Sequence, residues 1–165
     1  MTNKWIKRFA ALTHTIKLWS KDQSTQVGAV IVDETKRVLS MGYNGIPQGV
    51  NDDFEERHER PAKYFFFEHA ERNAIFTAGR NGVSLQDSTI FCSMFPCADC
   101  ARAIIQSGIT AVYSSAPDNN RWNESHQAAL LMFMEANVKV EYTLTDTLDP
   151  KEDADSLEEE REVDG

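Results

Sequence analysis

The stretch FPCADCARAIIQSGI, residues 95–109, combines the start of a helix with a pair of thiols. Cys97 and Cys100 are three residues apart, so they lie on one face of the first turn of the predicted helix, and both sulfurs can reach one ion. Pro96 stands just before them, where a helix N-terminus needs no amide donor. The free N–H groups and the helix dipole at that position favour thiolate over thiol. Because a lone C-x-x-C pair also occurs in redox motifs and zinc knuckles, a further ligand is needed to decide its chemistry.

A second short motif, His69-Ala70-Glu71, supplies that ligand at the start of another predicted helix. The combined pattern H-x-E followed by P-C-x-x-C is the known signature of zinc-dependent nucleobase deaminases. His69, Cys97 and Cys100 provide three ligands, which is the catalytic zinc pattern with one position left for water. Zinc lowers the pKa of that water to about 7. Glu71 is two residues past His69, about 200° around a regular helix, so we expect a proton carrier and not a fourth ligand.

Each of these residues also has an ordinary structural explanation when it is taken alone. A single helical histidine is more often a cap or a core residue than a ligand, and Glu71 alone would be a first-turn carboxylate favoured by the helix dipole. Cys97 and Cys100 alone would be small buried hydrophobes. We expect Cys92 to be one, because it alternates with its neighbours in a predicted strand. Only the joint arrangement favours a metal site.

The periodicity of the flanking segments predicts the fold. The β-branched run VGAVIV, residues 27–32, and the following polar turn at residues 33–36 predict an antiparallel hairpin. We expect strands over residues 27–32, 38–41, 89–93, 111–114 and 138–142, and helices over residues 3–20, 69–78, 97–107 and 122–136. This order predicts an α/β protein, a three-layer α/β/α fold whose five-stranded mixed sheet is covered by helices on both faces.

Several local features qualify this fold prediction. Trp19 continues the apolar face of the first helix, at the spacing set by Trp5, Phe9, Leu12 and Ile16. Residues 42–49, rich in glycine, are expected to form a loop, and Gly79 is expected to stop the helix that begins at His69. Residues 51–63 are charged and predict an exposed loop or short helix. The run Phe65-Phe66-Phe67 favours core or subunit interface over a base-stacking wall.

Length and charge indicate one domain with an acidic extension. The 165 residues are 41% apolar and 26% charged, an ordinary globular composition. Residues 146–165 hold ten Asp or Glu against two basic residues, a net charge of −8, which leaves −1 of the total −9 for residues 1–145. We therefore expect one folded domain over residues 1–145, which the zinc motifs indicate to be of the deaminase type, and an acidic, disordered, solubilising tail over residues 146–165. A strongly basic nucleic-acid-coating surface is excluded as the main theme.

Three features predict a cytoplasmic protein. No run of about 18 apolar residues is present, so a transmembrane helix is not expected. The N-terminal MTNKWIKRF lacks the apolar core of a secretion signal. Three cysteines are too few for a disulfide scaffold and point to a reducing compartment.

Four stretches together carry a family resemblance: WSKDQSTQVGAVIV (19–32), GYNGIPQG (42–49), HAERNAI (69–75) and FPCADCARAIIQSGI (95–109). They resemble the deoxycytidylate (dCMP) deaminase branch of the cytidine deaminase superfamily, over about residues 5–143. The resemblance implies the same fold and one catalytic Zn2+ on His69, Cys97 and Cys100. It also implies hydrolytic deamination of dCMP to dUMP with release of ammonia, in which Glu71 moves the protons.

The resemblance further implies substrate-binding residues. Asn44 would hydrogen-bond the sugar, and the backbone of Ala70 would read the pyrimidine. Arg80 matches a position that faces nucleotide phosphate or a neighbouring subunit, and Arg121 would bind phosphate. Each has an alternative: Asn44 is also a typical turn residue, Arg80 a typical helix C-terminal cation, and Arg121, like Lys21, a typical solvated surface residue.

Regulation, assembly and the exact substrate stay open at this level. A second, structural zinc is not expected, because the chain lacks the additional Cys/His cluster of some family members. In a separate departure from the family pattern, Glu68 stands before His69, where an apolar residue is more usual. A Mg2+-nucleotide effector such as dCTP or dTTP is left open. We expect a homo-oligomer, a dimer or hexamer, with no membrane or nucleic-acid partner. The alternatives are a deaminase of a modified cytosine nucleotide or of tRNA adenosine, which would need a basic groove, and a non-catalytic nucleotide-sensing module, which would not need Glu71.

Overall fold

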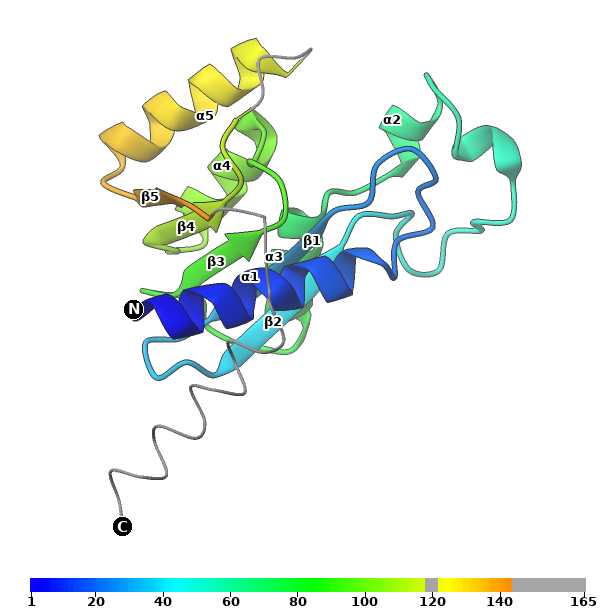
Figure 1. Cartoon of the computed structure of the whole chain (residues 1–165). Coiled ribbons are helices and arrows are strands. Elements are labelled where there is room, and N and C mark those ends of the chain that lie inside the picture. Colours follow the sequence, from blue (N-terminus) through cyan, green and yellow to red (C-terminus); the bar gives the residue numbers. More distant parts are fainter. Residues whose placement is uncertain (118–121, 144–165) are drawn as a thin grey trace.

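Five strands form one mixed sheet in the order β2-β1-β3-β4-β5, in a computed structural model that describes residues 1–117 and 122–143 (Figure 1). β1 pairs antiparallel with both β2 and β3, whereas β4 is parallel to both β3 and β5. The strands are β1 (Gly28–Val32), β2 (Val38–Tyr43), β3 (Thr89–Cys92), β4 (Ala111–Ser114) and β5 (Lys139–Tyr142). The helices are α1 (Asn3–Lys17), η1 (Glu55–Arg57), α2 (Lys63–Phe66), α3 (Ala70–Arg80), α4 (Ala98–Gln106) and α5 (Asn123–Glu135). The predicted five-stranded mixed sheet is confirmed.

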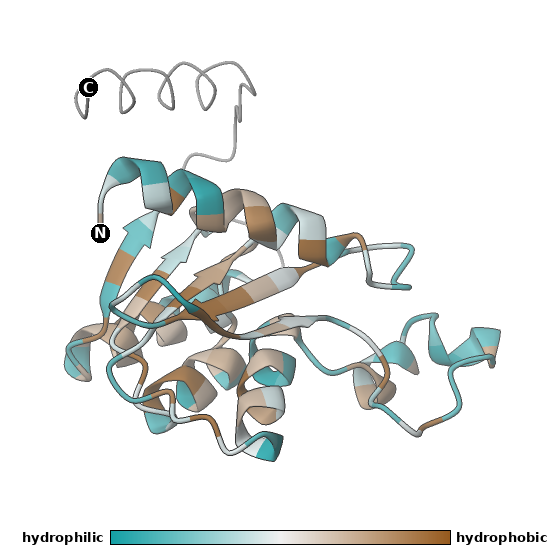
Figure 2. Ribbon diagram, turned by 90° about the horizontal axis from the view of Figure 1, so that it is seen from below, coloured by the Kyte–Doolittle hydropathy of each residue, from teal (hydrophilic) through white to brown (hydrophobic). Residues whose placement is uncertain are grey.

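Helices cover both faces of the sheet, as expected for three layers. α1 lies on one face, and α3, α4 and α5 lie on the other (Figure 2). β1 shows why, because all five of its residues are buried, which is typical of a strand covered on both sides. Val30 and Val32 belong to the cluster around α1, and Ala29 and Ile31 belong to the cluster around α3 and α4. No helix in the described part of the chain is both long and apolar enough to span a bilayer.

Contact between α3 and β2 is unusually close, and it depends on a glycine. A Cβ added at Gly42 would lie 2.5 Å from the carbonyl oxygen of Ala70 and 2.5 Å from the amide nitrogen of Ala74. Ser40, also on β2, donates a hydrogen bond of 2.7 Å to the carbonyl oxygen of Ala74. The expectation of a loop beginning at residue 42 was therefore wrong at its start. Gly42 pairs with Ala29 in the sheet, and it holds α3 against β2.

Two helix ends also differ from expectation. α1 ends at Lys17, where the chain turns so that the N–H of Trp19 donates to the carbonyl of Ile16 over 3.0 Å. Trp19 is 53% exposed, so its assignment to the buried face was wrong. α3 continues through Gly79 to Arg80, because Gly79 lies on the exposed side, where a helical glycine lowers stability without breaking the helix.

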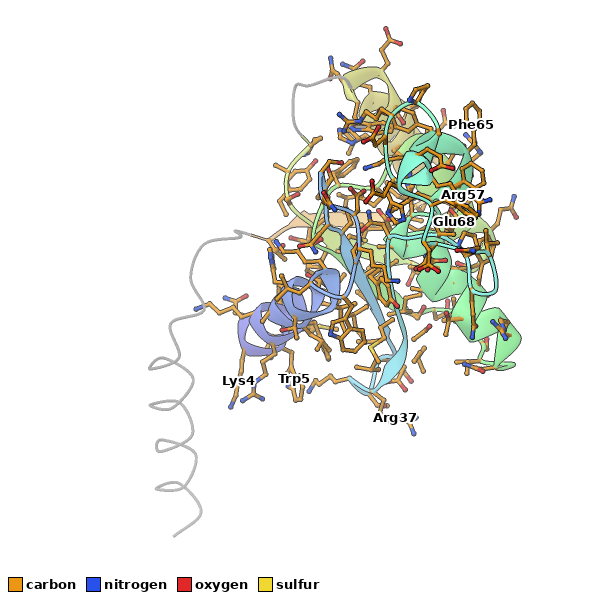
Figure 3. All side chains as sticks on the ribbon, turned by 90° about the vertical axis from the view of Figure 1, so that its right-hand side faces the viewer. Lys4, Trp5, Arg37, Arg57, Phe65 and Glu68 are labelled. Atoms are coloured by element: carbon orange, nitrogen blue, oxygen red, sulfur yellow. The ribbon has the colours of Figure 1, made fainter. Side chains whose placement is uncertain are left out.

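Residues 51–68, called the arm below, extend from the body and carry η1 and α2 (Figure 1). The Arg57 guanidinium lies 4.8 Å from the ring centroid of Phe66. Phe65 is 85% exposed, and Figure 3 shows it with Arg57 at the opposite end of the molecule from Trp5. Phe67 lines a cavity. The expectation of core or interface for the whole aromatic run was therefore wrong for Phe67. The predicted tail, residues 146–165, lies outside the described residues.

The same substitution at two glycines should have opposite effects on stability. Gly42→Ala forces a methyl group against the backbone of α3 and should lower the free energy of unfolding by about 1–3 kcal/mol. Gly79→Ala meets open space on an exposed helix position and should raise it by about 0.5–1 kcal/mol. Urea unfolding followed by circular dichroism measures both values. Equal stability of the two variants would contradict the close approach of α3 to β2.

Candidate active site

The N-termini of α3 and α4 meet at one point, and each begins with a predicted metal ligand. His69 is the N-cap of α3 and Cys97 the N-cap of α4, both with extended backbone, while Cys100 lies in the first turn of α4. Nδ1 of His69 lies 3.4 Å from Sγ of Cys97 and 3.4 Å from Sγ of Cys100. The ligand atoms of all three residues lie within 4.8 Å of one another.

This donor set fits zinc. Zn–N and Zn–S bonds of about 2.0 and 2.3 Å in a tetrahedron place a nitrogen and a sulfur about 3.5 Å apart, close to the two separations of 3.4 Å. Two thiols and one imidazole are a soft donor set suited to zinc. No fourth histidine, cysteine or carboxylate joins this group among the described residues. One coordination position is therefore left for water or substrate.

Other residues cap these two helices, because the N-cap side chains point to the metal site. Neither His69 nor Cys97 makes a side-chain cap hydrogen bond. Glu68 Oε1 accepts the N–H of His69 over 3.0 Å, and Ser125 Oγ of α5 accepts the N–H of Ala98 over 2.9 Å. Sequence reasoning found neither cap, although the unusual Glu68 was a signal. The caps leave the imidazole and the thiol free to bind a metal.

Electrostatics at the cluster favour a thiolate ligand and a protonatable carboxyl group. The hydrogen bond from the Cys100 thiol, reinforced by His69, lowers the pKa of Cys97 to about 4. Glu71 is buried in the first turn of α3, and this burial raises the pKa of its carboxyl group. Cys92 is buried in the core, as expected, and burial raises the pKa of its thiol. A carboxyl group with a raised pKa can exchange protons nearer neutral pH.

A cavity of about 120 Å³ opens over this cluster and joins the metal residues to more distant walls. His69, Glu71 and Cys97 line it, together with the predicted substrate residues Asn44 and Ala70. Residues of both zinc motifs therefore line one cavity together with Asn44 from the loop after β2.

The side chain of Asn44 is held by three hydrogen bonds. Its Nδ2 donates to Asp22 Oδ2 over 3.1 Å and to the carbonyl of Thr25 over 2.9 Å. Its Oδ1 accepts the N–H of Val27 over 2.8 Å. Both amide hydrogens are therefore used within the chain. A ligand can reach Asn44 only as a donor to the second lone pair of Oδ1.

Neither of the two predicted arginines is among the described residues that line the cavity. Arg80 lies at the end of α3, where it donates a hydrogen bond of 2.7 Å to Gln48 Oε1, and it does not line the cavity. Its role as a phosphate contact stays a prediction. Arg121 lies outside the described residues.

Sequence reasoning missed several residues that line the cavity, among them Asp22, Lys63, Trp122 and His126. Trp122 presents its ring edge-on to His69, with centroids 6.3 Å apart. His126 is buried, and its Nδ1 has no hydrogen-bond partner among the described residues. Trp122 and His126 lie at the start of α5. Sequence periodicity predicted this helix but not that its start faces the zinc motifs.

Comparisons with known proteins agree with this geometry. Residues 3–116 match the cytidine and deoxycytidylate deaminase zinc-binding region. An uncharacterized deaminase from the luxG 3′ region of Aliivibrio fischeri is 42% identical over 151 residues, covering 90% of this chain and 99% of that protein. Deoxycytidylate deaminase from Homo sapiens is 34% identical over 136 residues, covering 79% and 75%. The structure of dCMP deaminase from the cyanophage S-TIM5 in complex with dCMP and dUMP is 25% identical with a TM-score of 0.72, covering 87% and 99%. This chain therefore belongs to the cytidine and deoxycytidylate deaminase family, whose zinc-binding region it carries.

Proposed function

We propose that this chain catalyses the hydrolytic deamination of dCMP to dUMP with release of ammonia. The observation that carries the proposal is a buried carboxyl group, Glu71, in the same cavity as the His69, Cys97 and Cys100 cluster. A purely structural zinc site has four protein ligands and no use for a carboxyl group beside an open position. The similarity to a phage dCMP deaminase whose structure contains dCMP and dUMP supports the choice of substrate.

Glu71 carries the protons of this reaction. A zinc ion held by the three ligands would supply a water molecule activated at neutral pH. Glu71 accepts the proton that the attacking water loses and delivers it to N3 of the cytosine ring. It then takes the proton of the new hydroxyl group on C4 and delivers it to the amino group, which leaves C4 as ammonia. One C–N bond is replaced by one C–O bond, and one water is consumed for each ammonia released. The raised pKa of Glu71 suits this exchange, because a general acid–base works best when its pKa lies near the working pH.

The cavity wall supplies groups that orient the nucleotide. The second lone pair of Asn44 Oδ1 accepts a hydrogen bond from a sugar hydroxyl. Ala70 is the first residue of α3, so its N–H has no intrahelical partner and donates to the pyrimidine. The Trp122 ring, perpendicular to that of His69, offers an apolar surface to the base. Arg80 and Arg121 stay candidates for the phosphate on the basis of the resemblance.

A substrate screen tests the proposed reaction. Ammonia release is measured over cytosine nucleosides and their mono-, di- and triphosphates, a 5-substituted dCMP and a tRNA anticodon loop, with and without dCTP or dTTP plus Mg2+. We expect dCMP to have the highest kcat/KM. Preference for the tRNA would identify an RNA-editing enzyme, and no turnover of any compound would indicate a nucleotide-sensing module.

Replacing the proton carrier should abolish turnover and leave the metal in place. Glu71→Gln keeps the size and hydrogen-bonding capacity of the side chain but cannot carry a proton. We expect kcat to fall by about 10²–10⁴-fold, with zinc content unchanged by atomic absorption. Ammonia release at the wild-type rate would contradict the role of Glu71 and leave the fold assignment intact.

Two buried cysteines make a matched pair for testing the metal site. Cys100→Ala removes one of three ligands, so we expect the zinc content to fall from about one ion per chain to a small fraction and activity to be lost. Cys92→Ala removes a buried thiol from the core, where it should cost about 1 kcal/mol of stability and leave zinc bound. Zinc retention by both variants would contradict the proposed ligand set.

Self-association is a further proposal, and the arm supports it. Phe65 is 85% exposed and Tyr64 49% exposed, so α2 presents an aromatic surface of the kind found at subunit contacts. We expect a dimer or hexamer in sedimentation velocity, and a smaller species for Phe65→Ser. A monomeric wild-type protein at tens of micromolar concentration would contradict this assembly.

A further inference from the structure

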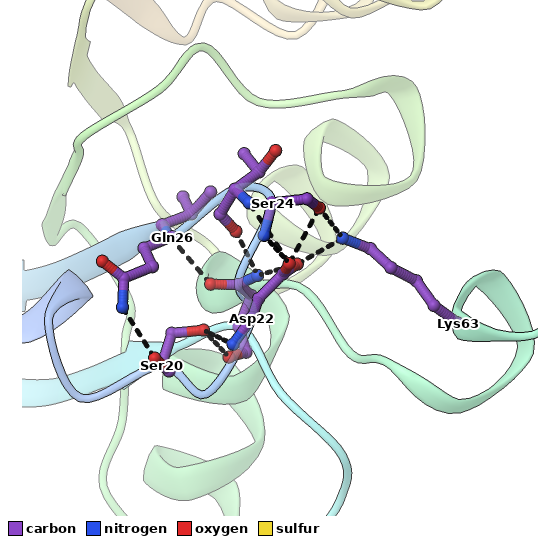
Figure 4. Close-up of polar contacts among 8 residues, drawn as sticks. Ser20, Asp22, Ser24, Gln26 and Lys63 are labelled. Atoms are coloured by element: carbon purple, nitrogen blue, oxygen red, sulfur yellow. Dashed lines mark hydrogen bonds and ion pairs between the residues drawn. The ribbon is translucent and has the colours of Figure 1, made fainter. Parts of the chain in front are cut away.

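A buried ion pair connects the arm to the cavity wall. Lys63, the first residue of α2, donates from Nζ to Asp22 Oδ2, and the two side chains are 10% and 3% exposed (Figure 4). Both residues line the cavity. Removing two charges from water is costly unless each finds partners. The hydrogen bonds of the Asp22 carboxylate and of the Lys63 ammonium group therefore show whether either group can still bind a ligand.

The carboxylate of Asp22 is neutralised by more than Lys63. Oδ1 accepts the N–H of Ser24 over 2.9 Å, the hydroxyl of Ser24 over 2.9 Å and the N–H of Thr25 over 3.2 Å. Oδ2 accepts Asn44 Nδ2 over 3.1 Å as well as Lys63. Burial alone would raise the pKa of Asp22, but the hydrogen bonds from Lys63, Ser24 and Thr25 outweigh it and lower the pKa. The negative charge is thus shared among four donors besides the ammonium group.

The ammonium group of Lys63 has donor capacity left. It carries three N–H bonds, of which two go to Asp22 Oδ2 and to Ser24 Oγ, the latter over 2.7 Å. No acceptor among the described residues takes the third. Lys63 is also the only lysine or arginine among the described residues that line the cavity. A dianionic ligand in this cavity would therefore meet its cation at Lys63.

The position of Lys63 next to Asn44 also fits a contact with the phosphate of a nucleotide. Asp22 Oδ2 accepts both from Lys63 and from Asn44 Nδ2, so the ammonium group and the amide of Asn44 are both within hydrogen-bond distance of one oxygen atom. Under the proposed function, Asn44 contacts the sugar. The phosphate of a nucleoside 5′-monophosphate is separated from the sugar ring by one methylene group and one oxygen. A phosphate bound beside Lys63 is therefore compatible with a sugar at Asn44 and a base at His69.

We propose that Lys63 binds the 5′-phosphate of the nucleotide substrate and so sets the preference for a monophosphate over a nucleoside. This inference rests on the proposed function, and it adds a phosphate-binding residue to Arg80 and Arg121. Asp22 and Ser24 act as positioning residues, because they hold the ammonium group in the cavity wall.

The test separates phosphate binding from a merely structural ion pair. Lys63→Met alone leaves Asp22 buried without its cation, which can unfold the protein. The double variant Asp22→Asn with Lys63→Met removes both charges, and Asp22→Asn alone is its matched control with the ammonium group retained. Lys21→Met is a second control, because Lys21 is exposed and paired with Asp52 away from the cavity. Zinc content and circular dichroism establish that each variant is folded and metal-loaded.

Two ratios are measured on each zinc-loaded variant: kcat/KM for dCMP against deoxycytidine, and Kd for dUMP against deoxyuridine by calorimetry. Loss of one hydrogen bond to a charged group should lower the preference for the nucleotide by about ten- to a hundredfold in the double variant. The ratios should fall by less in Asp22→Asn than in the double variant, because Asp22→Asn keeps the ammonium group but weakens its positioning, and they should not change in Lys21→Met.

Equal losses for nucleotide and nucleoside in the double variant would overturn the proposal, because the pair would then only hold the arm. Unchanged ratios would overturn it as well. If the wild-type protein deaminates no cytosine compound, the proposed function fails, while the Kd ratio for dUMP and deoxyuridine still decides the role of Lys63. The two failures are therefore distinguishable.

Discussion

The site depends on the meeting of two helix N-termini at one point beneath the cavity. His69 and Cys97 occupy the N-cap positions of α3 and α4, so their side chains leave the helices where unpaired N–H groups and positive dipole ends converge. That environment favours a thiolate and, through it, a divalent cation. It also requires that other residues satisfy the helix ends, which Glu68 and Ser125 do. Metal binding and helix capping compete for the same N-cap side chains, and caps from outside resolve the competition.

The sequence predicted the metal end of the site well, because its information is local. The spacing of Cys97 and Cys100 fixes their common face, and His69-Ala70-Glu71 places a ligand and a carboxyl group on one helix start. The order of strands and helices was also predictable, since each element shows its own periodicity. Boundaries were less predictable at Trp19 and Gly79, where tertiary contacts and exposure, which a single-sequence pattern does not contain, decided the outcome.

The substrate end of the site could not be predicted in the same way. Asp22 and Lys63 are 41 positions apart, and no period or motif connects them. Their meeting depends on the course of the arm, whose residues 51–63 were interpreted from the sequence only as a charged loop or short helix. The close approach of Gly42 to α3 is equally non-local. The residues next to Gly42 in the sequence do not distinguish it from a glycine in a turn. Such contacts follow from the packed fold and become visible only in three dimensions.

The metal ligands and the proposed substrate contacts come from different parts of the fold, so substitutions can affect them separately. The predicted zinc ligands and Glu71 lie at the starts of α3 and α4, so under the proposed function the groups that act at C4 do not come from the loops around the cavity. The groups that we propose for the sugar and phosphate come from the loop after α1, the loop after β2 and the arm, which meet through the Asp22 carboxylate. If these roles hold, a substitution in the arm should alter the preference among nucleotides without affecting proton transfer by Glu71, whereas a substitution at Asp22 should affect all three segments at once.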